Sequence, residues 1–339
     1  MDHPLLINTI QLLFGILILV YCGDQLVKGS VAIANHFKVS SLVIGLTVVA
    51  FGTSAPELIV SFGASITGHP EIALGNVIGS NIANIALVLG LTVLILPMPV
   101  SQQTIKRSWP IMFASGIILY GFMTNNVIGR NEGILMFVFL ILFIISSVKS
   151  ANRFPQEINI PKTANKYKIR VYLLVVVLAS VGLAIGSKFL ITGASGVALE
   201  MGISERIISI TIVAFGTSVP ELTASIIAAL KKENDISVGN IVGSNIFNVF
   251  GVIGISAGAH ALPLDFHEFR IDLNFMMAFY LLLLVFILPL KELFQKNGLS
   301  FIDRYKSVTV GRIARKEGAV FIFLYVIYIL LIFKTQTID

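Results

Sequence analysis

Charged side chains are scarce in this sequence. Asp, Glu, Lys and Arg make up only 12% of the 339 residues, whereas hydrophobic residues make up 56% and the mean hydropathy is +0.91. Soluble domains usually carry about 25% charged residues. The composition therefore excludes an ordinary soluble protein and predicts a polytopic membrane protein.

Cysteine is almost absent as well. Cys22 is the only one, so the chain can form no intramolecular disulfide and no cysteine-based zinc cluster. The five histidines form no paired motif of the HExxH kind, which argues against a histidine metal site. We expect no zinc site and no cofactor.

Long apolar runs follow one another along the whole chain, separated by short polar connections. Each run with its flanks approaches the roughly 20 residues that a helix needs to cross a bilayer. The first run is too long for a cleaved signal and is preceded by no Lys or Arg, so we interpret it as a true span. The runs predict an all-α protein with ten transmembrane spans, at about 5–28, 40–67, 70–96, 108–124, 132–148, 171–199, 204–230, 235–259, 272–290 and 318–334.

Lys and Arg are distributed unevenly between the two sets of connections. Most lie after spans 1, 3, 5, 7 and 9, and the positive-inside rule makes that side cytoplasmic. Both termini then lie outside the cytoplasm, and we expect a multi-pass protein of the cell (inner) membrane. The net charge of +6 reflects this topology and attraction to anionic membrane lipids, so no nucleic acid partner is expected. Trp109, next to two of the basic residues, fits an interfacial anchor.

A long block of sequence occurs twice. Residues 47–90 read TVVAFGTSAPELIVSFGASITGHPEIALGNVIGSNIANIALVLG, and residues 211–254 read TIVAFGTSVPELTASIIAALKKENDISVGNIVGSNIFNVFGVIG. Equivalent positions differ by 164, with no insertion or deletion. The same offset aligns Asp24 with Lys188, for which we expect a structural ion pair or snorkelling rather than a role in a site. A repeat of this length predicts two copies of one structural unit.

The two predicted copies contain five spans each. Because five is an odd number, the second copy enters the membrane from the opposite side and lies inverted, an arrangement typical of secondary transporters. We assign residues 1–148 to the first five-helix repeat, 149–170 to a cytoplasmic linker and 171–339 to the second repeat.

The motifs GTSAPE and GTSVPE should break spans 2 and 7, because Pro56 and Pro220 remove a backbone donor. A broken helix in lipid leaves carbonyl groups that protein, water or a bound ion must satisfy. The acid after each proline then lies near the positive N-terminal end of the second half-helix. The breaks predict a group of oxygen donors: carbonyls of Ala50, Phe51, Ala214 and Phe215, hydroxyls of Thr53, Ser54, Thr217 and Ser218, and carboxylates of Glu57 and Glu221.

Spans 3 and 8 carry the motifs GNVIGSNIAN and GNIVGSNIFN. Ser80 and Asn84 are four residues apart and share one helix face, as do Ser244 and Asn248. The glycines of each motif have GxxxG spacing, which allows close approach to a neighbouring helix: Gly75, Gly79, Gly239 and Gly243.

All these candidate ligands are hard oxygen donors, which favour calcium, sodium or similar cations. Two ionised glutamates in the bilayer are costly unless they are protonated or compensated. One Ca²⁺, two Na⁺ or two protons would each neutralise the pair, so a site that is favourable only when loaded predicts obligatory exchange. The candidate metal ligands are Ala50, Thr53, Ser54, Glu57, Ser80, Asn84, Ala214, Thr217, Ser218, Glu221, Ser244 and Asn248.

GTSxPEL followed by GNxxGSNI, twice in one chain, resembles the paired α-repeats of the cation/calcium exchanger superfamily, particularly its prokaryotic sodium/calcium exchanger branch. The resemblance covers nearly the whole chain. It implies calcium efflux driven by inward cation movement, with alternating access through sliding of spans 1 and 6 against the other spans. Some relatives carry an aspartate where this chain has Asn248, so the site here has two acids rather than three. The ligands implied are Thr53, Glu57, Ser80, Asn84, Thr217, Glu221 and Ser244, with the backbone of Ala50 and Ala214.

Other readings stay open at this point. A proton/calcium exchanger differs only in its coupling ion, although such relatives tend to show GNxxE where this chain has GTSxPE. An intramembrane hydrolase could use Glu57 and Glu221 as an acid/base pair, but no nucleophile motif accompanies them, so we expect no enzyme. A passive cation channel would need no counter-ion. Ser, Thr and Asn residues within membrane helices also form hydrogen bonds between helices without binding an ion. The sequence does not indicate an oligomeric state.

Overall fold

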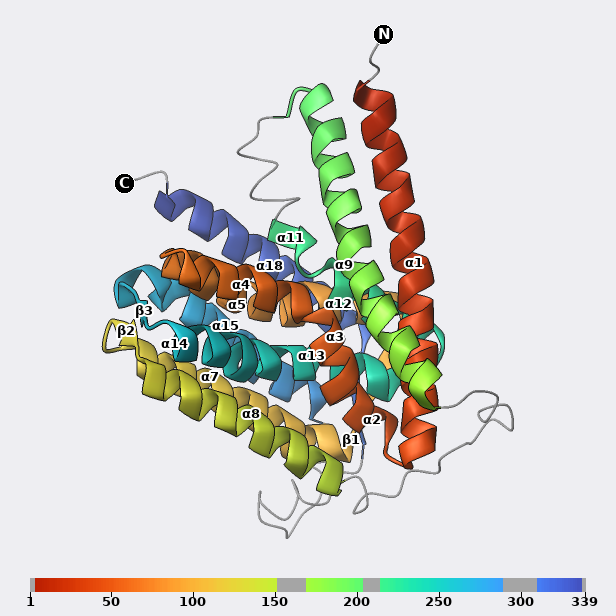
Figure 1. Ribbon diagram of the computed structural model, residues 1–339, viewed down its shortest axis with the longest axis horizontal. Helices are drawn as coiled ribbons and strands as arrows, with labels where there is room; N and C mark the ends of the chain where they lie inside the picture. The colour runs from red at the N-terminus through yellow and green to blue at the C-terminus, as the bar shows by residue number, and fades with distance from the viewer. Residues whose placement is uncertain (1–3, 151–168, 204–213, 289–309, 337–339) are drawn as a thin grey trace.

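Helices dominate the computed structural model, which describes residues 4–150, 169–203, 214–288 and 310–336 (Figure 1). A helical element occupies each of the ten predicted spans. Four elements, labelled η, are π-helical turns. In chain order the helical elements are α1 (Pro4–Phe37), α2 (Ser41–Ile44), η1 (Gly45–Val49), α3 (Ala50–Thr53), α4 (Ala55–Ile66), α5 (Pro70–Ala83), η2 (Asn84–Leu89), α6 (Gly90–Ile95), η3 (Thr104–Ser108), α7 (Trp109–Met123), α8 (Arg130–Ser150), α9 (Ile169–Glu200), α11 (Ala214–Gly216), α12 (Val219–Leu230), α13 (Asn234–Ile246), η6 (Phe247–Ile253), α14 (Gly254–Ala259), α15 (Phe266–Ile287) and α18 (Arg315–Gln336).

The lengths of the elements bear on the number of membrane crossings. Within the described ranges, six helices are long and apolar enough to cross a bilayer, or seven if the bent pair Ser41–Thr53 and Ala55–Ile66 counts as one span. The ten-span count therefore stays a prediction. The first half of predicted span 7, residues 204–213, and most of the predicted linker 149–170 lie outside the described residues.

Two of the long helical segments form the centre of the protein. In the most apolar stretch of Asn234–Ala259, 89% of the residues are buried, and in that of Pro70–Ile95, 72% are buried. For Pro4–Phe37 the share is only 11%. Because large apolar side chains on such a helix face outward, we interpret α1 as a peripheral, lipid-facing helix. The segments with the GNxxGSN motifs are the central ones.

Helices α1 and α9 form a pair that is set apart from the other helices. Figure 1 shows them side by side and steeply inclined to the rest. They approach closely at glycines: a methyl group on Gly15 would lie 2.5 Å from the Leu190 nitrogen, and one on Gly193 would lie 2.4 Å from the Leu12 nitrogen. Buried side chains of the pair form a second hydrophobic cluster, separate from the main core, together with residues of α2, η1, α12 and α13.

In the described connections there are four short strands, which the sequence did not predict. Strand β1 (Met98–Ser101) pairs antiparallel with β4 (Val310–Ile313), and β2 (Val127–Ile128) pairs with β3 (Leu262–Pro263). Pairing satisfies backbone groups of loops that meet in space. Each pair joins connections that the charge distribution had placed on the same side of the membrane, β1 and β4 on the cytoplasmic side and β2 and β3 on the opposite side.

The prediction for Trp109 as an interfacial anchor is wrong. This side chain is only 8% exposed, and its ring stacks on Phe113. Its indole Nε1 donates a hydrogen bond of 2.7 Å to the backbone carbonyl of Tyr280, because α7 packs against α15 at this point. The indole therefore connects two helices inside the protein.

The GxxxG glycines of the second repeat pack as predicted. A methyl group on Gly239 would lie 2.8 Å from the Leu42 carbonyl oxygen, and one on Gly243 would lie 2.7 Å from the Leu46 carbonyl oxygen. Both glycines thus let α13 pack directly on the backbone of α2 and η1. The equivalent half-helix of the second copy lies among residues 204–213, outside the described residues.

This contact predicts a clear effect on stability. Gly243→Ala should lower the free energy of unfolding by about 1–3 kcal/mol, since the added methyl group would overlap backbone atoms that cannot move aside cheaply. Gly121→Ala is the matched control, because Gly121 is an exposed helical glycine with no described atom within 4 Å of its added methyl group. Thermal unfolding in detergent measures both variants, and equal midpoints would contradict the packing described here.

Candidate functional site

The helix breaks predicted at the two GTSxPE motifs are present in the structure. The segments before and after Ser54 are bent by 49°. Ser54 has φ −86° and ψ 3°, and the equivalent Ser218 has φ −88° and ψ 2°. Pro56 and Pro220 lie in the first turns of α4 and α12, where the missing N–H costs nothing. The backbone of the two copies therefore turns in the same way at the same position.

The two acids of these motifs are deeply buried. Glu57 is 1% exposed and Glu221 is fully buried, and each lies in the first turn of its half-helix. The partial positive charge of a helix N-terminus favours a carboxylate there. The two carboxyl groups also lie close enough to interact electrostatically. When both are ionised, the site holds two negative charges that the protein itself balances only in part.

Hydrogen bonds between the two copies join several predicted ligands. The Thr53 hydroxyl donates to Asn240 Oδ1 at 3.0 Å and lies 3.3 Å from Ser244 Oγ. The Ser54 hydroxyl donates to Glu221 Oε1 at 3.2 Å. Each of these contacts connects the broken helix of the first copy with residues of the second, so the candidate site lies between the copies.

The packing of the helices brings the remaining ligands to the same place. Helix α4, with Glu57, packs against η6, which contains Asn248, and α12, with Glu221, packs against η2, which begins at Asn84. Single π-helical turns are often found at functional sites. Here the wide turns lie at equivalent positions of both copies, beside the residues predicted to bind cations.

The strongest feature of the site is its set of unpaired polar atoms. Among the described residues, twelve buried side-chain oxygen or nitrogen atoms have no hydrogen-bond partner, and eight of them belong to six predicted ligands. Burying polar atoms without partners is costly. A cation would satisfy the oxygens, so their concentration here supports a cation site. The six residues are Glu57, Ser80, Asn84, Ser218, Glu221 and Asn248.

The two halves of the site are not identical. Ser54 donates to Glu221, but among the described residues no hydrogen bond joins the equivalent pair, Ser218 and Glu57. Both carboxyl oxygens of Glu57 are unpaired, whereas only Oε2 of Glu221 is. Thr217 is half-buried in the turn between α11 and α12, and no bond of the kind formed by Thr53 links it to Ser80.

The backbone carbonyls at the breaks differ from the expectation. The Ala50 carbonyl accepts the Ser54 N–H at 2.9 Å and the Thr53 hydroxyl at 3.3 Å. The Phe215 carbonyl accepts the Ser218 N–H at 3.1 Å. These two carbonyls are therefore not free in this conformation, because the turn at each serine still closes a backbone hydrogen bond. Ala214 is the first residue of α11, and Phe51 follows Ala50 in α3.

Two asparagines that the sequence analysis did not select hold the acid-bearing helices. Asn240 Nδ2 donates to the Glu221 carbonyl at 3.3 Å and to Ser225 Oγ at 2.9 Å. Asn76 makes the same two bonds in the first copy, to the Glu57 carbonyl and to Ser61. They are the first Asn of GNxxGSN in each copy, and this repetition in the sequence was a signal that could have identified them.

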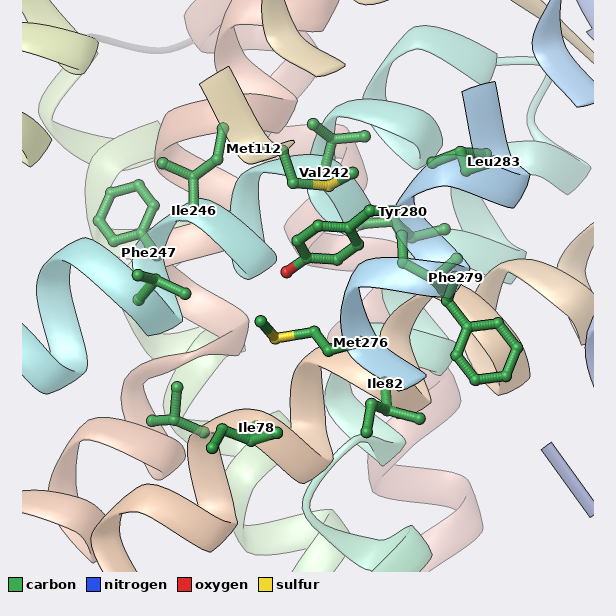
Figure 2. Close-up of a cluster of buried hydrophobic side chains, with 14 of the residues drawn as sticks. Ile78, Ile82, Met112, Val242, Ile246, Phe247, Met276, Phe279, Tyr280 and Leu283 are labelled. Carbon is green, nitrogen blue, oxygen red and sulfur yellow. The ribbon is translucent and has the colours of Figure 1, made fainter. Parts of the chain in front are cut away.

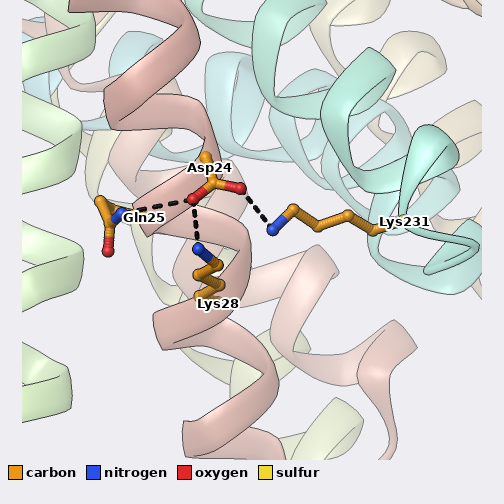
Figure 3. Close-up of polar contacts among 4 residues, drawn as sticks. All are labelled: Asp24, Gln25, Lys28 and Lys231. Atoms are coloured by element: carbon orange, nitrogen blue, oxygen red, sulfur yellow. Dashed lines mark hydrogen bonds and ion pairs between the residues drawn. The ribbon is translucent and has the colours of Figure 1, made fainter.

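Asp24 lies outside the site, as expected. Its carboxylate binds Lys28 at 2.7 Å and Lys231 at 2.5 Å, and Figure 3 shows it between these two side chains, with Gln25 also donating to it. The pair with Lys231 connects α1 to the end of α12. Lys188, its equivalent in the second copy, is exposed on α9. The expected ion pair is therefore confirmed for Asp24, with partners other than Lys188.

Comparison with known proteins identifies the relatives of this chain. The family model of the sodium/calcium exchanger protein matches residues 7–149 and 171–334. The chain is 30% identical to the sodium/calcium exchanger MaX1 of Methanosarcina acetivorans, over 96% of this chain and 99% of that protein. It is 34% identical to the inner membrane protein YrbG of Escherichia coli K12, over 75% of this chain and 80% of that protein.

A solved structure of the sodium–calcium exchanger NCX_Mj, soaked with 10 mM Na⁺ and no Ca²⁺, has a similar fold. The TM-score is 0.75 at 30% sequence identity, and the match covers 96% of this chain and 99% of that chain.

Asn240 offers a test of the hydrogen-bonded half of the site. Asn240→Ala removes bonds to Thr53, to the Glu221 carbonyl and to Ser225, each worth about 0.5–1.5 kcal/mol net. We expect a lower unfolding midpoint and a smaller stabilisation by added calcium, both measured by thermal unfolding in detergent. Asn274→Ala is the control, because Asn274 is exposed and only accepts a 3.4 Å bond from Tyr120. A calcium-induced shift that is unchanged in Asn240→Ala would contradict a role at the site.

Proposed function

The chain belongs to the sodium/calcium exchanger family, and we propose that it is an antiporter that exchanges calcium for sodium. As a member of this family it is a membrane transporter of cations and no enzyme, so the hydrolase reading is abandoned. Calcium and sodium are the proposed substrates. The single observation that carries the proposal is the cluster of unpaired buried oxygens around Glu57 and Glu221.

The energy of the two acids explains why the site should exchange ions. On insertion scales, one charged side chain at the bilayer centre costs about 2.5–3.5 kcal/mol. Two carboxylates that repel each other add to this cost, and a bound Ca²⁺ removes most of it. Sodium ions can take its place. Because the unloaded, doubly charged state is unfavourable, the protein changes conformation only when it is loaded, and calcium moves in exchange for sodium.

The proposed calcium ligands are the oxygen donors of both copies. Calcium usually takes about six to eight oxygen ligands. We assign the charge to Glu57 and Glu221 and the neutral ligands to hydroxyls, amides and carbonyls that surround them. The unpaired side-chain oxygens need no rearrangement to bind, and the Thr53 oxygen can bind a cation through its lone pairs while its proton is donated to Asn240. The neutral ligands are Ala50, Thr53, Ser54, Ser80, Asn84, Ala214, Thr217, Ser218, Ser244 and Asn248.

We further propose ten spans in two inverted repeats, 1–148 and 171–339, with both termini outside the cytoplasm. The paired strands support this topology, because β1 with β4 and β2 with β3 join connections of the same predicted side.

Location in an inner membrane is supported by the relationship to YrbG. Alternating access would follow from sliding of the α1–α9 pair, whose two helices pack closely on each other at glycines.

The coupling ion needs its own test, because a proton/calcium exchanger would use the same two acids. In vesicles loaded with calcium, we expect calcium release to follow an inward sodium gradient and to ignore a pH gradient of the same size. Release that follows the pH gradient would identify protons as the coupling ion. Release without any counter-ion would identify a channel.

Neutralising either acid should stop transport. We expect Glu57→Gln and Glu221→Gln to lower sodium-driven calcium flux at least about tenfold, since each removes one of the two charges that bind calcium. The unfolding midpoint without calcium should stay the same or rise, because a buried charge is removed. Glu268→Gln, at an exposed position on α15, should transport normally. Near-normal flux in either site variant would mean that its acid is structural.

A further inference from the structure

A chain of buried hydrogen bonds leads from helix α15 to the candidate site. The Tyr280 hydroxyl donates to Asn245 Oδ1 at 3.0 Å. The backbone carbonyl of Asn245 accepts from Asn81 Nδ2 at 3.4 Å, and Asn81 Oδ1 accepts from Asn248 Nδ2 at 3.1 Å. Of these four residues only Asn248 is a predicted ligand. We call the four residues the tyrosine–asparagine relay.

Every member of the relay is closed off from solvent. Tyr280, Asn245, Asn81 and Asn248 are all 0% exposed. Figure 2 shows the Tyr280 hydroxyl pointing into the interior, toward the space between Met276 and Ile246. A buried polar network of this kind fixes the orientation of its side chains, because any rotation leaves a group without a partner. The amides of the relay are therefore held in one orientation.

The relay decides which atom Asn248 offers to a cation. Its amide nitrogen donates to Asn81, so its amide oxygen points away from Asn81, and that oxygen has no partner. Cations bind amide oxygen and not amide nitrogen. Asn248 is thus preset as an oxygen ligand, which matters because it lacks the charge of the aspartate found in some relatives.

The first copy lacks this arrangement. Under the offset of 164, the equivalent bond would run from Asn84 Nδ2 to Asn245 Oδ1. That oxygen accepts from Tyr280 instead, while Asn245 Nδ2 donates to the Ile241 carbonyl at 2.7 Å. Both amide atoms of Asn84 are left without a partner. One tyrosine hydroxyl therefore makes the two asparagine ligands different.

The residue equivalent to Tyr280 in the first copy is a glycine that packs against the tyrosine ring and its neighbour Met277. The residue 164 positions earlier is Gly116, and a methyl group there would lie 3.2 Å from Tyr280 Cε2 and 2.6 Å from Met277 Sδ. The Trp109 indole bond to the Tyr280 carbonyl holds this part of α15 in place. The first copy thus makes space for the ring and contributes no hydroxyl of its own.

We propose that Tyr280 is a positioning residue that presets Asn248 as an oxygen ligand and so sets the calcium affinity of the site. This inference rests on the proposed calcium transport. Without the hydroxyl, Asn245 Oδ1 is free to pair with Asn84. The resulting shift of Asn245 reaches Asn81 through the Asn245 backbone carbonyl, to which Asn81 Nδ2 donates, and Asn248 can then turn its nitrogen toward the cation. Tyr280 itself does not touch the cation.

Tyr280→Phe tests the proposal directly. In reconstituted vesicles, we expect the calcium concentration for half-maximal sodium-driven flux to rise about twofold to tenfold, the factor that corresponds to one net hydrogen bond. The maximal rate should change little, because the acids are intact. Tyr328→Phe is the matched control: Tyr328 is also buried and donates a 2.9 Å bond to Asp272, away from the site. An unchanged half-maximal concentration in Tyr280→Phe overturns the proposal.

A double variant distinguishes an effect of Tyr280 on the orientation of Asn248 from an effect on packing alone. In Asn248→Asp the ligand has two equivalent oxygens, so there is no orientation left to preset. Adding Tyr280→Phe to this variant should shift the calcium-induced rise in unfolding midpoint by less than Tyr280→Phe shifts it in the original sequence. Equal shifts in both backgrounds would mean that the tyrosine acts through packing alone.

Asn81→Leu gives the same test if Tyr280→Phe does not fold. It removes the acceptor of the Asn248 amide, so it should also raise the half-maximal calcium concentration, and an unchanged value contradicts the relay.

Different results would contradict the proposed function and the relay. A wild-type protein that does not move calcium contradicts the proposed function, whereas wild-type transport with unaltered variants contradicts the relay alone.

Discussion

Two carboxyl groups buried in the interior of an apolar protein are the constraint on which the rest of this structure depends. Glu57 and Glu221 are almost fully buried and keep three carboxyl oxygens without a partner. The protein compensates with half-helix N-termini and a few hydroxyl groups. A cation site needs this partial compensation. If the protein neutralised both acids fully, a cation would gain little by binding, and if it compensated neither, burial of the two charges would prevent folding.

The helices that carry the candidate site lie at the centre of the fold, and less buried helices lie around them. The segments that carry the GNxxGSN motifs are the most buried in the described structure, and α1 is among the least. Asn76 and Asn240 hold the acid-bearing turns by bonds to the backbone of the acids, while three of the four carboxyl oxygens keep no partner. Rigid positioning of the backbone and freedom of the ligand atoms are thus achieved together.

The candidate site consists of equivalent residues from the two copies of the repeat. At some positions the copies differ, and these differences change the surroundings of the equivalent residues. The backbone turns at Ser54 and Ser218 are nearly the same, yet their hydroxyls are used differently. Tyr280 opposite Gly116 is a second departure, and it distinguishes Asn248 from Asn84. If the two copies were identical, the two halves of the candidate site would surround a bound ion with the same groups. Substitutions outside the repeated motifs therefore give the two halves of the candidate site unlike surroundings.

The sequence by itself determined the membrane class, the positions of the described helices, both breaks and the oxygen-bearing residues proposed as ligands, because hydropathy, proline and an exact offset of 164 are local or repetitive signals. It did not determine the engaged Ala50 and Phe215 carbonyls, the buried role of Trp109, the strand pairs or the relay of Tyr280. These depend on which groups meet when helices distant in sequence pack together. Hydrogen bonds of that kind are set by orientation and distance, and only the tertiary structure decides them.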